Sequence, residues 1–267
     1  MKKISIEELK KIQINILDYV DQFCRENKIN YWLSYGSLLG AVRHKGYIPW
    51  DDDIDIGMLR DDYERFIAIF NKKNNKYRVC DYSIDHDWPL PYGKILDTTT
   101  LMYEPDKKSG ITTAVFVDLF IYDDAPNNKQ KLKRAFKKRT IYRKLHLWQT
   151  YKEAYNQERK KYNFIRYPIH LFLQLFPKNY FLKRILKIEV MFRNNASNKV
   201  ASISDQGNYV FDKNVLEELT ELEFEGKKFY APQNYDLVLR TFYGDYMKLP
   251  PKEKRVSHHR FEAYYKE

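Results

Sequence analysis

The sequence predicts an α/β protein with a mixed sheet at its core and a strongly basic helical insertion. Apolar residues recur at three- and four-residue steps near the N-terminus, and short β-rich runs alternate with helical patterns up to Pro126. Residues 127–193 then carry nineteen Lys or Arg residues against three acids, although the whole chain has a net charge of only +11. The remaining chain is therefore acidic, and the basic residues form one block.

The expected elements follow from local patterns in chain order. Ser5 and Glu8 form a capping box that begins a helix reaching Asn27. Within the insertion, Pro168 and Pro177 are expected to break the helices. Elsewhere we expect strands at 31–35, 51–58, 77–82, 94–96 and 112–122, helices at 38–43, 61–72 and 234–243, and a hairpin or strand at 221–230.

Length and composition limit the class of protein. The chain has 267 residues, of which 43% are hydrophobic and 16% aromatic, so it can bury a core and is not disordered. Its two cysteines give no disulfide framework, and it has no spanning apolar run. Because the N-terminal residues are amphipathic and partly acidic, we expect no signal peptide. We expect a cytoplasmic protein with a catalytic core at 1–126, a basic helical insertion at 127–198 and a C-terminal segment at 199–267 that packs back on the core.

An acidic strand carries the first chemical signal. Asp53 and Asp55 alternate with Ile54 and Ile56, so on a strand the two carboxylates share one face while the isoleucines enter the core. Carboxylate oxygens on one face are ligands for Mg²⁺ or Mn²⁺. The alternative is a solvated acidic turn, since aspartate is common where helices begin.

A glycine–serine pair lies upstream of these carboxylates. Gly36 and Ser37 end a predicted strand and open a helix, where backbone N–H groups can bind a phosphate. With Asp53 sixteen residues beyond Ser37, the layout resembles the nucleotidyltransferase superfamily, whose core is similar to the DNA polymerase β palm. That superfamily adds a third carboxylate on a neighbouring strand. Asp118, in AVFVDLFIY, is the candidate, although it could also be an ordinary residue at a strand end.

A closer resemblance extends from Tyr31 to about His259. The string YGSLLGAVRHKGYIPWDDDIDIGM resembles the signature of the LicD family, and PYGKILDTTT, FVDLFIYDDAP, LEFEGKKFYAP and YGDYMKLPPKEKRVSHH match the same family. The resemblance implies transfer of a phospho-alcohol from a CDP-activated donor to a sugar hydroxyl, with release of CMP. Bacterial members transfer phosphocholine to lipopolysaccharide or teichoic acid, whereas fukutin-type relatives use CDP-ribitol.

The resemblance also assigns residues. Asp53 and Asp55 would hold one or two Mg²⁺ or Mn²⁺ ions, and Asp118 would be a further ligand or the base for the acceptor hydroxyl. Plain surface charge is the alternative for each basic residue, and His258 and His259 receive no role. The expected substrate-binding residues are Gly36, Ser37, Arg43, His44, Trp50 and Lys94.

Two interpretations of the basic insertion stay open. Its dense apolar residues alternate with Lys and Arg, so it could lie on an anionic membrane surface, which would suit an enzyme that acts on lipid-linked glycans. It could equally be a packed helical hairpin with a basic outer face. A nucleic-acid partner is not expected, because no recognised nucleic-acid module accompanies the charge.

Two rival functions remain at this level. A nucleotidyltransferase of the same fold would attach a nucleotide and release pyrophosphate instead of CMP. A non-catalytic protein could use the basic block to bind anionic glycans or lipids. The retained set of Gly36, Ser37, Asp53, Asp55 and Asp118 favours an enzyme.

Overall fold

A computed structural model describes residues 1–73, 76–103, 112–150, 163–194, 197–203, 207–256 and 262–266. A seven-stranded mixed sheet forms its centre, and five of the strands lie side by side in one path. Two further short strands continue from the end of β7. The path runs β1 (Trp32–Leu33), β2 (Asp55–Leu59), β7 (Phe116–Ala125), β4 (Gly93–Asp97) and β3 (Tyr77–Cys80), and the extension is β8 (Lys199–Ala201) and β9 (Val210–Asp212).

The pairing of β2 with β7 is parallel, whereas the other pairings described in this sheet are antiparallel. Asp55 lies opposite Asp118 in that parallel register. Alternation holds as predicted, because Ile54 and Ile56 are fully buried on the other face. The prediction of a mixed α/β core is confirmed.

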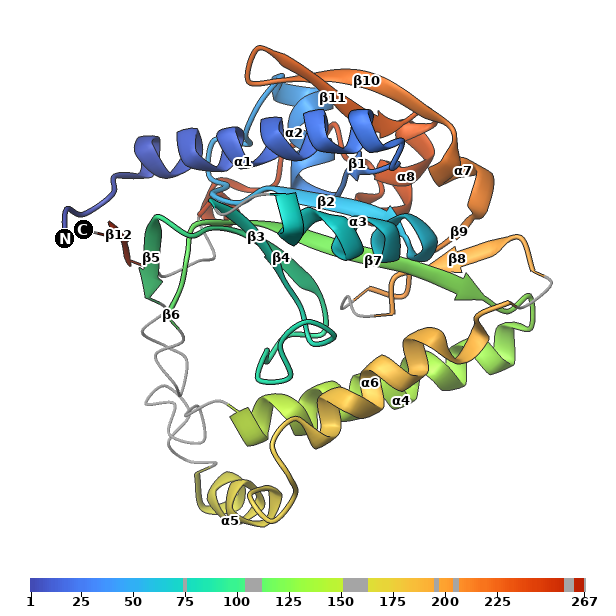
Figure 1. Cartoon of the computed structure of the whole chain (residues 1–267). Helices are drawn as coiled ribbons and strands as arrows, with labels where there is room; N and C mark the ends of the chain where they lie inside the picture. Colours follow the sequence, from blue (N-terminus) through green and yellow to red (C-terminus); the bar gives the residue numbers. More distant parts are fainter. Residues whose placement is uncertain are drawn as a thin grey trace.

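Two amphipathic helices, α1 (Ile6–Asn27) and α3 (Arg60–Lys73), pack against the sheet strands. Ser5 caps α1 with the predicted capping box to Glu8, and apolar residues of both helices are buried in the core. In Figure 1, α1 lies above the large sheet and the helices of the insertion lie below it.

The first connection differs from the prediction. The strand expected at 31–35 is limited to Trp32 and Leu33, and α2 (Tyr35–His44) begins immediately after Ser34. Gly36 and Ser37 therefore lie in the first helical turn and do not precede the helix. The alternation of aromatic residues continues to Tyr35, but Tyr35 is already the first residue of α2. Alternation alone therefore did not locate the end of the strand.

Several strands were missed or divided. The run expected at 112–122 is two strands, β6 (Thr112–Thr113) and the long β7. A small separate sheet joins β6 to β5 (Thr100–Tyr103) and β12 (Glu262–Tyr265), which have no strong alternation of their own. Strands this short form because a neighbouring strand completes their hydrogen bonds, and that pairing is invisible in local sequence.

The insertion is helical, as expected, with α4 (Lys129–Thr150), α5 (Asn163–Leu173) and α6 (Tyr180–Glu189), followed by the short helix η3 (Val190–Phe192). Helices α4 and α6 lie side by side (Figure 1). Pro177 separates α5 from α6, but the break predicted at Pro168 is wrong, since this proline lies inside α5. One missing hydrogen bond is tolerated there because His170 Nδ1 lies 2.7 Å from the Trp148 carbonyl and anchors the helix.

A buried ionic cluster fixes the insertion to the core. Arg60 at the start of α3 donates two hydrogen bonds to Asp123 of β7, at 2.7 and 2.8 Å. Glu189 at the end of α6 lies 3.5 Å from the same guanidinium. Burial raises the pKa of Glu189 well above its ordinary value, although Arg60 opposes that shift.

The C-terminal segment contacts the core through β11, which lies against β1, and α8, which lies against α2. The hairpin of β10 (Leu219–Phe224) and β11 (Lys227–Pro232) is confirmed, as is α8 (Tyr235–Tyr243), which Asn234 caps. A short helix, α7 (Lys213–Glu217), links β9 to β10, and the 3₁₀ turn η4 (Lys252–Lys254) follows α8. Within the described residues, no helix is both long and apolar enough to cross a bilayer.

Candidate functional site

The structure brings the three predicted carboxylates together. Asp53, Asp55 and Asp118 each offer one oxygen, and these oxygens all lie within 4.8 Å of one another. Asp55 and Asp118 are neighbours across the parallel pair of β2 and β7, and Asp53 lies two residues before Asp55. The parallel register thus creates an acidic centre from residues far apart in the sequence.

The acidic centre has an excess of negative charge. Asp55 is only 9% exposed, and burial raises its pKa well above its ordinary value. The charges of Asp53, Asp118 and Asp51 raise the pKa further, whereas Lys94 lowers it. Three hard oxygen ligands that repel one another in a buried place fit a divalent cation such as Mg²⁺ or Mn²⁺. The metal itself remains a prediction.

Lys94 lies against the third carboxylate. Its Nζ is 2.5 Å from Asp118 Oδ1, and it also lies 3.1 Å from the centre of the Phe116 ring. The lysine is 3% exposed, so its charge is balanced inside the protein by Asp118. We expected Lys94 to bind phosphate, and sequence reasoning missed its pairing. The signal was a single lysine within an otherwise apolar strand, because a buried charge needs a partner.

The start of α2 adjoins this acidic centre. The Asp55 backbone N–H donates a hydrogen bond to Ser37 Oγ at 2.8 Å, which joins the helix to β2. A Cβ atom on Gly36 would lie 2.5 Å from Asp51 Oδ2, so the glycine makes room for that carboxylate. From α1, the Gln13 side chain donates to the Asp52 carbonyl at 3.0 Å and holds the acidic loop. The N-terminal end of α2 therefore faces the carboxylates, as the resemblance implied.

A strained residue forms the turn into α2. Tyr35 has a φ of 41°, in the left-handed region that non-glycine residues rarely adopt. Its ring stacks on Phe242 at 4.6 Å and meets Phe120 edge-on at 4.9 Å. Packing of this ring compensates a backbone cost of about 1–3 kcal/mol and fixes where Gly36 and Ser37 lie.

Arg43 and His44 lie at the opposite end of α2, roughly 10 Å along the helix axis from Ser37. Arg43 donates to the Tyr246 carbonyl at 2.7 Å, and its Nε lies 3.0 Å from His44 Nε2. Burial and the neighbouring Arg43 lower the pKa of His44. Here Arg43 fixes the C-terminal segment, and binding of substrate by either residue stays a prediction.

Aromatic faces can bind the quaternary ammonium of choline, but the aromatic residues in and beside the family-like strings are mostly part of the core. Trp32 is 1% exposed and packs on Tyr122, and Tyr92 stacks on Phe120. Trp50 is half-buried beside His44 and lies 5.7 Å from the Arg255 guanidinium. These contacts define no aromatic cage among the candidates, and His258 and His259 lie outside the described residues.

Comparison with known proteins relates the chain to one family and to individual transferases. The model of a family described as LicD/FKTN/FKRP, nucleotidyltransferase domain, matches residues 28–91. The lipopolysaccharide cholinephosphotransferase LicD of Haemophilus influenzae is 32% identical over 99% of both chains. The mouse and human ribitol 5-phosphate transferase FKRP are 56% identical over 34 residues, which cover 13% of this chain and 7% of theirs.

The full-length similarity, together with an acidic centre beside a helix N-terminus, identifies the protein as a phosphotransferase. It belongs to the LicD family. Membership in this family of transferases argues against the non-catalytic alternative.

The raised pKa of Asp55 predicts a pH-dependent stability. Its folded-state pKa lies above the ordinary 3.8, so the unfolded chain releases a proton that the folded protein retains. Stability in EDTA should therefore fall as the pH rises from about 4 through the folded pKa. We expect Asp55→Asn to remove this loss and to be at least as stable as the wild type at pH ~7, with no turnover.

Urea unfolding in EDTA at pH ~4 and ~7, with turnover assays, measures both effects. Asp61→Asn, an exposed aspartate at the start of α3, is the matched control and should alter neither. A marked loss of stability in Asp55→Asn at neutral pH would contradict the electrostatic account.

Replacement of Asp118 should lower the stability of the protein, in contrast to Asp55→Asn, because Asp118 balances the charge of Lys94. Asp118→Asn leaves a buried ammonium without its carboxylate, a change that costs about 3–5 kcal/mol. Adding Lys94→Met should restore most of this stability without restoring activity. Chemical denaturation of the single and double variants measures the coupling, and equal stability in all of them would show that the ion pair is unimportant.

Proposed function

We propose that this protein transfers a phospho-alcohol group, most simply phosphocholine, from a CDP-activated donor to a sugar hydroxyl of a cell-surface glycan, with release of CMP. The observation that carries the proposal is the acidic centre of Asp53, Asp55 and Asp118 beside the start of α2, in a chain similar along its whole length to a cholinephosphotransferase. Lipopolysaccharide and teichoic acid are the acceptor classes that we favour.

The carboxylates would prepare the donor for in-line displacement at phosphorus. Asp53 and Asp55 would hold Mg²⁺ or Mn²⁺, which supplies positive charge to the donor phosphates and to the leaving CMP. The backbone N–H groups at Gly36 and Ser37 begin a helix whose positive dipole end favours a phosphate group. Catalysis would then rest mainly on positioning and on charge neutralisation.

Asp118 would be either a third metal ligand or the base for the acceptor hydroxyl. Its contact with Lys94 stabilises the carboxylate form, which is the form required both for a metal ligand and for a base. We favour the ligand role, because its oxygen lies within 4.8 Å of those of Asp53 and Asp55. As the alternative, Asp118 would take the proton of the attacking hydroxyl.

The transferred alcohol is open to test. The partial similarity to a ribitol 5-phosphate transferase keeps CDP-ribitol as an alternative donor, and CDP-glycerol is another. Attachment of a nucleotide with release of pyrophosphate remains the alternative reaction for the palm-like core that we propose.

A donor panel distinguishes these reactions. We expect CMP release from CDP-choline with a glycan acceptor present, loss of activity in EDTA, and recovery with Mg²⁺ or Mn²⁺. Parallel reactions contain CDP-ethanolamine, CDP-glycerol, CDP-ribitol or a nucleoside triphosphate, and chromatography follows CMP and pyrophosphate. Pyrophosphate without CMP would establish the nucleotidyltransferase alternative, and full activity in chelator would end the metal proposal.

We also propose that the insertion rests on an anionic membrane surface, where lipid-linked acceptors lie. The two halves of the insertion differ. On α6 the apolar residues Phe181, Leu182 and Ile185 are buried, as the packed-hairpin interpretation expected. On α5 and the turn after it, Phe164 is 75% exposed, Phe172 58% and Leu175 79%.

Such a surface fits the interface of a bilayer. Exposed apolar side chains gain by entering the boundary between head groups and acyl chains, and basic residues are attracted to anionic lipids. The exposed face of α6 carries Lys183, Arg184 and Lys187, and α4 adds further exposed lysines. Membrane contact would therefore combine α5 with the charges of its neighbours.

Vesicle binding tests this proposal. Each basic residue near an anionic surface contributes about 1 kcal/mol, so changing Lys183, Arg184 and Lys187 to Gln should weaken binding on the order of 100-fold. The same change at Lys11, Lys72 and Lys248, exposed lysines outside the insertion, is the matched control. Sedimentation with phosphatidylserine or phosphatidylcholine vesicles at several salt concentrations measures it. Equal binding to both vesicle types would favour the packed hairpin alone.

A further inference from the structure

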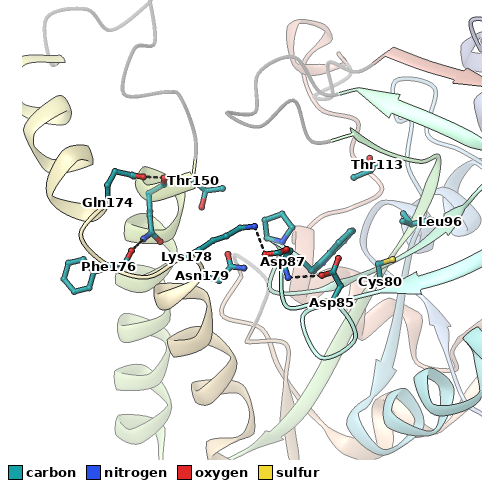
Figure 2. A pocket seen from close by; sticks show the side chains of 13 residues that line it. Cys80, Asp85, Asp87, Leu96, Thr113, Thr150, Gln174, Phe176, Lys178 and Asn179 are labelled. Atoms are coloured by element: carbon teal, nitrogen blue, oxygen red, sulfur yellow. Dashed lines mark hydrogen bonds and ion pairs between the residues drawn. The ribbon is translucent and has the colours of Figure 1, made fainter.

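A cavity of about 750 Å³ lies between the sheet and the insertion. Figure 2 shows Cys80, Leu96 and Thr113 on the side of the strands, with Thr150 and Gln174 on the side of the insertion helices. Its volume is in the range of ordinary ligand sites. No predicted site residue lines it, and local sequence patterns did not indicate it.

The cavity opens on the same face of the sheet as the acidic centre. Cys80 is the cross-strand partner of Lys94, and Leu96 follows Lys94 by two residues on β4. Partners across a ladder, and residues two apart on one strand, share a face. The cavity therefore begins roughly 7 Å along β4 from the lysine that contacts Asp118.

Contacts between the insertion and the loop after β3 fix the walls of the cavity. Asn179 donates to the His86 carbonyl at 3.0 Å, and Lys178 pairs with Asp87 at 2.7 Å. His146 Nε2 lies 2.7 Å from the Pro89 carbonyl. The cavity is thus a formed site that needs both the core and the insertion.

Its lining is suited to a sugar. The lining includes hydroxyl, amide and carboxylate groups, from Thr150, Gln174 and Asp85, together with the rings of Trp88 and Phe176. The polar groups can form hydrogen bonds with sugar hydroxyls, and the aromatic rings can cover the apolar faces of a sugar.

Two polar atoms of the lining have no hydrogen-bond partner among the described residues. They are Thr113 Oγ1 and Gln149 Oε1, and both are buried. Buried polar atoms are normally paired. The Gln149 amide is held by its N–H bonds to backbone carbonyls, including that of Leu173 at 3.0 Å, whereas the Thr113 hydroxyl can turn into the cavity by rotation about χ1 and pair with a ligand hydroxyl.

The position of the cavity assigns it to one substrate. An attacking oxygen and a leaving group lie on opposite sides of the phosphorus. The start of α2 lies beside β1 and β2, whereas the cavity lies beside β4 and β3, with the acidic centre between them.

On the basis of the proposed function, we infer that the cavity binds the acceptor glycan and presents its hydroxyl to the acidic centre from the side opposite to CMP. Thr113 becomes a residue that positions the acceptor.

Cys80 reports on occupancy of the cavity. It is half-buried and lines the cavity, whereas Cys24, the other cysteine, is fully buried, and burial raises the pKa of both thiols. Methyl methanethiosulfonate at mildly alkaline pH should therefore label Cys80 first, as mass spectrometry measures.

We expect saturating methyl glycosides of glucose, galactose or N-acetylgalactosamine to slow this labelling at least threefold, and CDP-choline to leave it unchanged. Failure of every glycoside would overturn the inference, and so would protection by CDP-choline, because the cavity would then bind the nucleotide.

A kinetic variant tests the same site through turnover. Thr113→Val removes a hydroxyl that has no hydrogen-bond partner in the part of the chain that the structure describes, so the melting temperature should not fall. The KM for the acceptor should rise roughly two- to tenfold, as for a lost neutral hydrogen bond, while the KM for the donor and its hydrolysis without acceptor stay the same.

Thr140→Val, at an exposed threonine of α4 bonded only within its own helix, is the matched control. An unchanged acceptor KM in Thr113→Val overturns the inference. Absence of CMP release from every CDP donor would instead reject the proposed function, while the labelling experiment would still report on the cavity.

Discussion

The repulsion among three neighbouring carboxylates is the constraint on which the rest of the structure depends. Parallel pairing of β2 with β7 sets Asp55 opposite Asp118, and burial makes their mutual repulsion strong. The fold responds with Lys94 on one side of the centre and the start of α2 on the other. A protein that folded for stability alone would not collect these charges, so their cost is explained by the chemistry they allow.

The strands on the two sides of the acidic centre, β1 and β2 on one side and β4 and β3 on the other, have different surroundings. Near β1 and β2, the strained Tyr35 and the hydrogen bond of Ser37 fix a helix start suited to phosphate. Near β4 and β3, the insertion closes a cavity with polar walls. Because both sides meet at Asp118 and Asp55, small shifts of either wall would alter the distance between reacting groups.

Local patterns predicted the elements that have strong periodicity, such as α1 with its capping box, α8 and the β10–β11 hairpin. They also predicted the grouping of Asp53, Asp55 and Asp118, through alternation and family resemblance. Local patterns could not predict contacts between residues that lie far apart in the sequence. The Lys94–Asp118 contact, the small sheet of β12, β5 and β6, and the cavity all depend on which segments meet in space. At Pro168 a strong local pattern led to a wrong prediction. The helix continues through this proline because His170 anchors it to the Trp148 carbonyl.

The insertion leaves and re-enters the core at directly paired residues, because Ala125 at the end of β7 lies opposite Lys199 at the start of β8. Topologically, the whole basic block is one greatly lengthened hairpin loop, whose two ends are separated by a single strand spacing of about 5 Å. Loop-closure entropy rises only slowly with length, so evolution could enlarge, shorten or exchange this segment without disturbing the strands that carry the carboxylates. A change confined to this one loop would therefore leave the register of Asp55 and Asp118 as it is.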